Sequence, residues 1–155
     1  MLLPLFEWCE ATMLGRAVRE SLWMFPVLEA IHLVGLSLLG GALLVVDFRL
    51  LGVGLRDSTI AALDRQARPW MLGAAGLMIV TGVLLFLSEA IKCYYNTSFW
   101  VKITTLPVAL LFTLLVKERF ARTAQETSTA SRWIGSVDLL LWFIVAAGGR
   151  WIGFS

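Results

Sequence analysis

The sequence predicts an all-α integral membrane protein, a bundle of four membrane-spanning helices preceded by an interfacial helix. Hydrophobic residues make up 59% of the 155 residues and charged residues only 15%, whereas a soluble domain carries about a quarter charged residues. The mean hydropathy is +0.81. The charges also gather in clusters between long apolar runs. Four such runs in so short a chain leave too little polar surface to enclose them in a soluble fold.

Each apolar run is long enough to cross a membrane. The hydrocarbon core of a bilayer is about 30 Å thick and a helix rises about 1.5 Å per residue, so a span needs roughly 20 apolar residues. Before the second run, Asp57-Ser58 predicts the N-cap of a short connecting helix, and Pro69 suits the first turn of a span. Residues 1–155 are therefore expected to form a single membrane domain, with spans at 22–46, 70–91, 99–116 and 133–152.

Residues 4–20 are predicted to form the interfacial helix. Phe6, Cys9, Met13 and Ala17 recur along one side of such a helix, and charged residues occupy other positions. An apolar stripe on a short charged helix is typical of a segment that lies in the membrane interface. An alternative is that this segment leads directly into the first span.

The distribution of basic residues predicts the orientation. Cytoplasmic loops are enriched in Lys and Arg. The side shared by the first and third loops holds Arg49, Arg56, Arg65, Arg68, Lys117, Arg119, Arg122 and Arg132. The opposite side holds Arg16, Arg19, Lys92, Lys102 and Arg150. This asymmetry predicts that both termini lie outside the cytoplasm. The net charge of +2 is too small to indicate a nucleic-acid partner.

His32 and Glu29 are the most informative polar residues within the apolar runs. Ionisable side chains inside a span are costly and are candidates for function. His32, the single histidine of the chain, lies about ten residues into the first span, roughly 15 Å from its end. Glu29 and Gly35 share its helix face, and Gly35 is expected to leave room beside the imidazole. The alternative is a histidine hydrogen-bonded to a neighbouring helix, with glycine serving close packing.

Other spans place polar residues at a comparable depth. Thr81 lies at a similar depth on the second span. With the predicted orientation, Glu89, Lys102 and Arg150 lie in the outer half together with Glu29 and His32 of the first span, and these residues are expected to line one cavity. A structural ion-pair network would give the same pattern. By contrast, four residues near the inner helix ends are predicted to be interfacial anchors: Asp47, Arg49, Lys117 and Glu118.

The two cysteines also fall on the predicted outer side. Cys9 belongs to the interfacial segment and Cys93 follows the second span. A disulfide persists in an oxidising compartment, so a Cys9–Cys93 bridge is one possibility. The alternative is a pair of unrelated thiols near the interface.

Several stretches of the chain match a common pattern. They are Glu20-Ser21-Leu22-Trp23, Phe25-Pro26, Leu28-Glu29, Ile31-His32, Asp47-Phe48-Arg49-Leu50-Leu51-Gly52, Thr81-Gly82, Ser88-Glu89 and Gly149-Arg150-Trp151-Ile152. In these stretches the chain resembles a bacterial family of small four-helix membrane proteins described only as a domain of unknown function. The resemblance covers nearly the whole chain. It implies the four-span fold and a bacterial plasma membrane location, without an established activity.

A looser likeness concerns the first span, where a histidine is followed by glycine and then by Arg-Leu. In this it is similar to membrane protoporphyrinogen oxidases that carry haem and to copper-resistance membrane proteins of the D type. Many members of the closer family have a second histidine near the end of the third span. This chain has Leu114-Leu115-Val116-Lys117 there, which argues against two-histidine haem ligation within one chain.

The leading hypothesis is a membrane redox or electron-transfer subunit that binds haem b with His32 as an axial ligand. Glu29 would orient the imidazole, Gly35 would leave room for the group, and Lys102 and Arg150 would pair with propionates. One alternative is the handling of a metal ion, such as copper bound at His32, or of protons, through the outer-half polar site. Another is a non-catalytic subunit of a larger membrane complex or of a homo-oligomer. No hydrolase or phosphate-loop motif is present.

Overall fold

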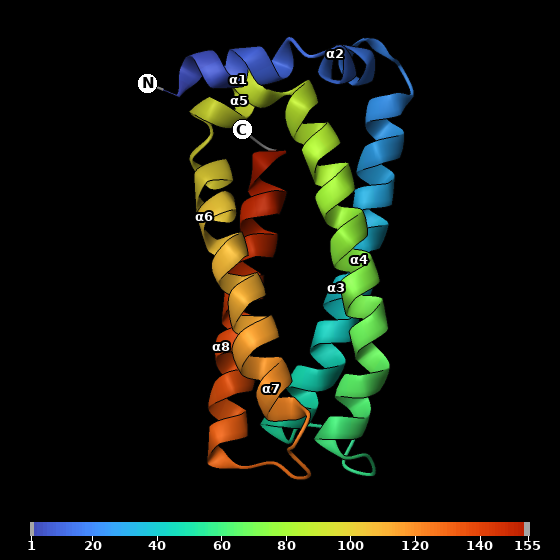
Figure 1. Cartoon of the computed structure of the whole chain (residues 1–155), viewed down its shortest axis with the longest axis vertical. Coiled ribbons are helices and arrows are strands. Elements are labelled where there is room, and N and C mark those ends of the chain that lie inside the picture. The colour runs from blue at the N-terminus through green and yellow to red at the C-terminus, as the bar shows by residue number, and fades with distance from the viewer. Residues whose placement is uncertain (1, 154–155) are drawn as a thin grey trace.

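The computed structural model describes residues 2–153, and within that range every regular element is a helix. Figure 1 shows their arrangement. In chain order they are α1 (Leu3–Glu10), α2 (Met13–Glu20), α3 (Met24–Leu51), α4 (Ile60–Ser88), α5 (Ala90–Tyr95), α6 (Thr97–Phe112), the π-helical turn η1 (Thr113–Lys117), α7 (Glu118–Ala121) and α8 (Thr129–Ile152).

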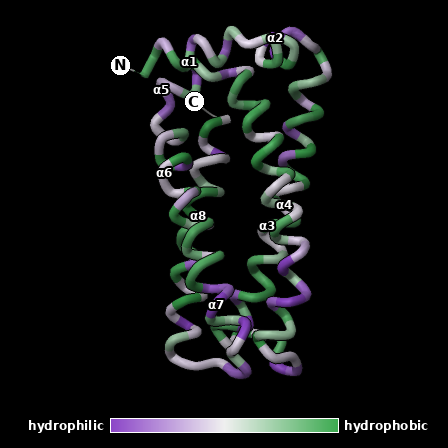
Figure 2. The backbone as a smooth tube through the Cα atoms, in the orientation of Figure 1, coloured by the Kyte–Doolittle hydropathy of each residue, from purple (hydrophilic) through white to green (hydrophobic). Residues whose placement is uncertain are grey.

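Four segments are long and apolar enough to cross a membrane: Met24–Leu51, Ile60–Ser88, Thr97–Ala121 and Thr129–Ile152. The all-α fold with four spans is therefore confirmed, and the chain is a multi-pass membrane protein suited to a lipid bilayer. Hydrophobic residues cover the long shafts, and hydrophilic residues gather at the two ends and around α7 (Figure 2).

The second span differs from its prediction at its start. The separate connecting helix expected before residue 70 is continuous with the span, so α4 begins at Ile60 and contains Pro69. The N-cap is Thr59, whose hydroxyl accepts a hydrogen bond from the amide of Ala62, and not Asp57-Ser58. A proline removes only one backbone donor from a helix, and the packing of α4 along α3 holds the helix through that point.

The bundle consists of two helix pairs. α3 packs along α4 and α6 packs along α8, and the pairs meet through α3 with α8 and through α4 with α7 (Figure 1). One core cluster contains Leu39 and Leu43 of α3 and Met71 of α4, with Trp142 of α8 packed against it. A second core cluster, which includes Leu50 and Ile60, lies toward the α3–α4 and α7–α8 connections. We call that end of the bundle the loop end.

The opposite end is crossed by α1 and α2 (Figure 1), and we call it the cap end. The predicted helix at 4–20 is two helices, because the Thr12 side chain accepts a hydrogen bond from the amide of Gly15 and starts α2 anew. Phe6 is buried between the aromatic rings of α4, α5 and α6. The break resets the helical phase, so Met13, expected on the same side as Phe6, is 83% exposed.

Glu10 of α1 binds both α2 and α5. Its carboxylate pairs with Arg19 of α2 at 3.0 Å and accepts a hydrogen bond of 2.7 Å from the amide of Ile91 in α5. Arg19 also donates to the carbonyl of Ser88 at the end of α4. These contacts hold α1 and α2 over the ends of the spanning helices at the cap end (Figure 1), which is the end nearer to His32.

Candidate functional site

His32 faces the neighbouring helix of its own pair. Its Nδ1 lies 2.7 Å from the hydroxyl oxygen of Thr81 on α4. The Thr81 hydroxyl donates its proton to the carbonyl of Leu77 at 2.8 Å, so towards the imidazole it acts as an acceptor. With the Thr81 hydroxyl directed to Leu77, a neutral His32 has its proton on Nδ1 and a lone pair on Nε2; with the hydroxyl directed to Nδ1, the tautomer is reversed. The first of these tautomers can bind a metal or accept a proton.

Two glycines lie beside the imidazole. A Cβ on Gly82 would stand 3.3 Å from His32 Cε1, so the absence of a side chain there lets the ring approach α4. Gly35 was expected to leave room for a bulky group. In the structure Met78 and Leu77 fill that space, since a Cβ on Gly35 would lie 3.0 Å from Met78 Cγ. Gly35 thus serves the close packing of α3 on α4.

Lys102 approaches the site from the other helix pair. Its side chain crosses the glycines of α8, where a Cβ on Gly149 would lie 3.3 Å from Nζ. Lys102 is close enough to His32 for its charge to act on the imidazole. Among residues 2–153 no hydrogen bond or ion pair satisfies the Lys102 ammonium. A half-buried cation with no hydrogen bond or ion pair to the described residues therefore lies within electrostatic range of both His32 and Cys93.

The remaining predicted site residues lie at the margins. Glu29 is exposed on α3. Glu89 pairs with Lys92 at 3.8 Å on the surface of the cap end. Arg150 is exposed near the end of α8. The structure therefore brings together three of the expected outer-half residues, His32, Thr81 and Lys102.

The cysteines are not bonded to each other. Cys93 is buried in α5, Cys9 is half-buried in α1, and both are free thiols, although α1 packs against α5. Within residues 2–153 no three His, Cys, Asp or Glu side chains converge as a metal cluster would require. The cysteines and His32 thus do not form a shared ligand set.

A second polar cluster lies deep in the bundle toward the loop end, and here the predicted anchoring of Asp47 and Lys117 is wrong. Lys117 Nζ lies 2.7 Å from Asp47 Oδ1 and 2.6 Å from Asp138 Oδ2. All three residues are at most 1% exposed. α3 and α7 run on to Leu51 and Ala121, so both predicted anchors lie a full turn inside the helix ends and face the bundle interior. We call these three residues the triad.

The π-helical turn η1 supplies two donors to one carboxylate of the triad. Thr113 opens the turn and Lys117 closes it. The Thr113 hydroxyl lies 2.6 Å from Asp138 Oδ1, and Lys117 binds Oδ2 of the same carboxylate. Trp142 Nε1 donates to Thr113 Oγ1 at 2.9 Å. π-Helical turns are frequent at functional sites. The sequence indicated this cluster through Asp138, because an acid within the last apolar run requires a buried cation as its partner.

The other two predicted anchors are also buried. Glu118 is 2% exposed and pairs with Arg68 at 3.2 Å and with Arg122 at 3.0 Å. Arg49 donates to the carbonyl of Ser58 at 2.7 Å and to the hydroxyl of Thr127 at 2.8 Å. These residues tie the loops of the loop end together and do not anchor single helices in the interface. Sequence spacing alone does not show that the loops at this end fold over Arg49 and Glu118.

A family model described as "Family of unknown function (DUF6644)" matches residues 5–155. The chain belongs to this family. No curated protein and no solved structure matches the chain. The DUF6644 assignment confirms the resemblance to an uncharacterised family, and the model supplies the four helices that such a membrane family requires.

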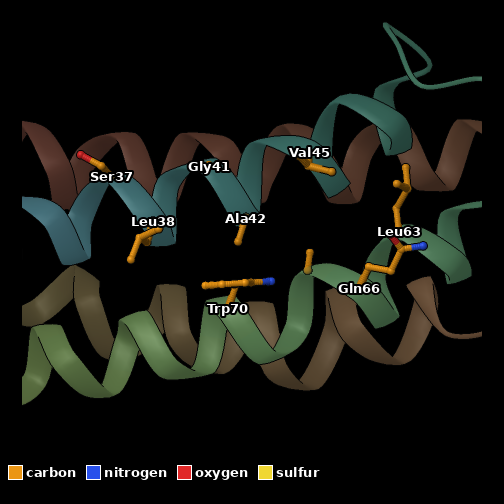
Figure 3. A pocket seen from close by; sticks show the side chains of 9 residues that line it. Ser37, Leu38, Gly41, Ala42, Val45, Leu63, Gln66 and Trp70 are labelled. Atoms are coloured by element: carbon orange, nitrogen blue, oxygen red, sulfur yellow. The ribbon is translucent and has the colours of Figure 1, made fainter.

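A groove on the DUF6644 bundle surface lies between α3 and α4, apart from both clusters. It measures about 390 Å³ and runs from Ser37 and Leu38 past Trp70 to Leu63 (Figure 3). A Cβ on Gly41, in the same groove, would meet nothing within 4 Å. Neither His32 nor any residue of the triad lines this groove.

Proposed function

We propose that this protein is a membrane haem b protein, a redox or electron-transfer subunit in which Nε2 of His32 is an axial ligand of the iron. The observation that carries the proposal is the hydrogen bond of 2.7 Å between His32 Nδ1 and the Thr81 hydroxyl. Metal-ligating histidines donate their other ring N–H to a neighbouring acceptor, which fixes the tautomer and raises ligand basicity. Thr81 gives His32 that arrangement from within the apolar bundle.

The donor set fits the group in two further respects. Neutral imidazole is a common axial ligand of haem. Lys102 is a cation near His32 without a protein partner, and a propionate carboxylate is a suitable counter-ion for it. Haem would supply one-electron transfer, and the chain would hold it, orient the imidazole and exclude water. Glu29 and Gly35 have no direct part in this proposal.

The coordination state follows from the histidine count. The chain has one histidine, so haem in a single copy has His32 as its only imidazole ligand. A five-coordinate iron, a non-histidine sixth ligand and a second copy that supplies its own His32 all satisfy this constraint. The last would make the protein a homo-oligomer. We place the protein in the bacterial plasma membrane, as the family resemblance implies, and we orient both termini outside the cytoplasm on the basis of the Lys and Arg distribution.

The test is the visible absorption spectrum of the detergent-purified protein from haem-sufficient cells, oxidised and then reduced with dithionite. We expect a Soret band and reducible α and β bands in the wild type, and their loss in His32→Ala. Glu29→Gln is the matched control, since Glu29 is exposed on the same helix, and it keeps the spectrum. Added imidazole should restore the bands to a folded His32→Ala variant. A colourless wild-type protein would overturn the proposal.

A further inference from the structure

The triad of Asp47, Lys117 and Asp138 is a cluster of ionisable groups that the proposed haem site does not use. Its members come from α3, η1 and α8 and are almost entirely buried. Ionisable groups inside a membrane bundle are costly, and they commonly mark ion pathways or proton relays. Two carboxylates facing one ammonium carry a formal charge of one negative unit. The binding of a single proton would make the triad neutral.

The charged groups around the triad do not supply the missing positive charge. Lys117 is the only cation in contact with its carboxylates among residues 2–153. Toward the loop end, α4 contributes Asp64 and Arg68, and α7 contributes Glu118, with Arg122 following it. Both of those arginines are paired with Glu118. A buried net charge is strongly unfavourable away from water, so proton uptake is the available means of neutralising it.

Asp47 is the acceptor that the contacts favour. Asp138 binds Thr113 through one oxygen and Lys117 through the other. Asp47 has its ion pair with Lys117 and lies beside the Asp138 carboxyl group, and neither of its buried carboxylate oxygens has a hydrogen-bond donor in good geometry. A carboxylate with fewer donors is less stabilised in its charged form. The contacts therefore favour Asp47 as the site of the proton.

Glu118 is a buried acid next to the triad along the chain, and it is paired with arginines at the loop end. It follows Lys117 directly in the chain, and both residues act electrostatically on Asp64. Its Oε2 is shared by Arg68 and Arg122, whose side chains are about half exposed. Its Oε1 is buried and has no hydrogen-bond partner. Glu118 thus has one oxygen held by groups that reach water and another that is buried without a hydrogen-bond partner.

We propose that the triad is a proton-binding site that takes up one proton from the loop end by way of Glu118 and holds it on Asp47. In the first step an O–H bond of hydronium breaks, an O–H bond forms on Glu118 Oε1, and water is released. In the second step the proton passes to an oxygen of Asp47 and Glu118 becomes a carboxylate again. Lys117 remains an ammonium throughout, and no electron moves. The proposal is independent of haem.

The first test is infrared spectroscopy of the full chain in lipid bilayers as the pH is lowered. A protonated aspartic acid has a C=O stretching band that a carboxylate lacks. We expect one such band well above the pH at which an exposed aspartate is protonated, and we expect it to shift in protein made with ¹³C-carboxyl aspartate. The label requires no substitution, so the test does not depend on a variant that folds. Absence of the band in folded wild-type protein would overturn the proposal.

Three variants locate the proton. Asp47→Asn removes both the acceptor and the excess charge, and the band should disappear. Lys117→Met removes the cation, so the two carboxylates must share a proton and the band should appear at higher pH. Asp57→Asn is the matched control, because Asp57 is exposed in a loop, and it should leave the band unchanged. A band that persists in Asp47→Asn would overturn the assignment to Asp47.

A pH-jump experiment tests the route through Glu118. Glu118→Gln keeps the side-chain shape and a carbonyl acceptor for the arginines but cannot pass a proton through a carboxyl group. We expect the band to form at least tenfold more slowly, as about 1.4 kcal/mol of added barrier would produce, and to reach the wild-type amplitude. An unchanged rate in Glu118→Gln would overturn the route while leaving the Asp47 site in place.

Discussion

Lys117 and Asp138 form an ion pair of 2.6 Å in which neither side chain is more than 2% exposed. The two residues belong to different helices of the pair formed by α6 and α8, and Asp47 adds the contact to α3. Three of the four spans are therefore joined at one point in the interior. The helix pairs also meet through contacts between α3 and α8, and the ion pair between Lys117 and Asp47 is the buried charged link from one pair to the other.

Removing Lys117 alone should destabilise the fold. Lys117→Met leaves two buried carboxylates without a cation, and breaking a buried pair in this way typically costs about 3–5 kcal/mol. Reversible unfolding in mixed detergent, followed by circular dichroism, measures the loss. The matched control is Lys92→Met, which removes a half-exposed pair with Glu89 and should cost no more than about 1 kcal/mol.

Replacing the whole triad should cost less than removing its cation. Substitution of a complete buried ion cluster by apolar residues of similar size is often neutral or stabilising. We expect the triple variant Asp47→Leu, Lys117→Met, Asp138→Leu to unfold at a higher denaturant concentration than Lys117→Met alone. A triple variant that is less stable than the single one would show that these side chains have packing roles beyond their charges.

Gly148 should be sensitive to the addition of a single methyl group. A Cβ there would lie 3.3 Å from Lys102 Cβ and 3.3 Å from the carbonyl of Ser98, so Gly148→Ala forces α6 and α8 apart. Overpacking of this kind costs about 1–3 kcal/mol. Gly76→Ala on α4 is the control, because a Cβ there meets nothing within 4 Å and alanine favours the helix. Thermal unfolding in detergent should fall for the first variant and stay level or rise for the second.

Thr81 should control how firmly haem is retained. Thr81→Val keeps the shape of the side chain but removes the acceptor for His32 Nδ1. The loss of such a supporting hydrogen bond typically lowers affinity about 10–100-fold. Thr81→Ser keeps the hydroxyl and should bind as the wild type does. Titration of the apoprotein with haem, read at the Soret band, distinguishes the two variants; equal affinities would remove Thr81 from the site.

Cys93 should be a slow nucleophile at neutral pH. Burial raises the pKa of its thiol from an ordinary value of 9.0 to about 11, with the charge of Glu89 acting in the same direction. Alkylation of Cys93 by iodoacetamide in a Cys9→Ala background should therefore be slow at pH 7.5 and accelerate as the pH approaches 11. If alkylation of the wild type required prior reduction, the Cys9–Cys93 disulfide suggested by the sequence would be present instead.

The raised pKa of the Cys93 thiol also makes the stability of the fold depend on pH. A thiol whose pKa is raised on folding favours the folded state while it stays neutral. Its contribution is complete below pH 9 and is lost as the pH rises from 9 toward 11. Cys93→Ala should reduce that part of the decline in stability above pH 9. Denaturant unfolding at pH 8 and at pH 10.5 measures the difference between the variant and the wild type.

The sequence predicted the spans well because their signal is local. Each run of about 20 apolar residues has to cross the hydrocarbon, whatever its neighbours are. The predicted fourth span at 133–152 ends at the same residue as α8, Ile152. The depth of His32 also followed from its position along one helix. The start of α4 was missed because Pro69 is a weak stop signal once neighbouring helices support the backbone.

The sequence by itself determined the fold class, the four spans and the presence of a histidine and several acids inside them. Only the tertiary structure decided which of these groups meet. In that structure His32 forms a hydrogen bond with Thr81 and Glu29 is exposed at the surface. Lys117 forms ion pairs with both Asp47 and Asp138. The physical reason is the rotation of each helix about its own axis. Successive residues are about 100° apart around that axis, so the rotation decides whether a polar side chain points to the interior or to the lipid. That rotation is fixed by packing between helices distant in sequence.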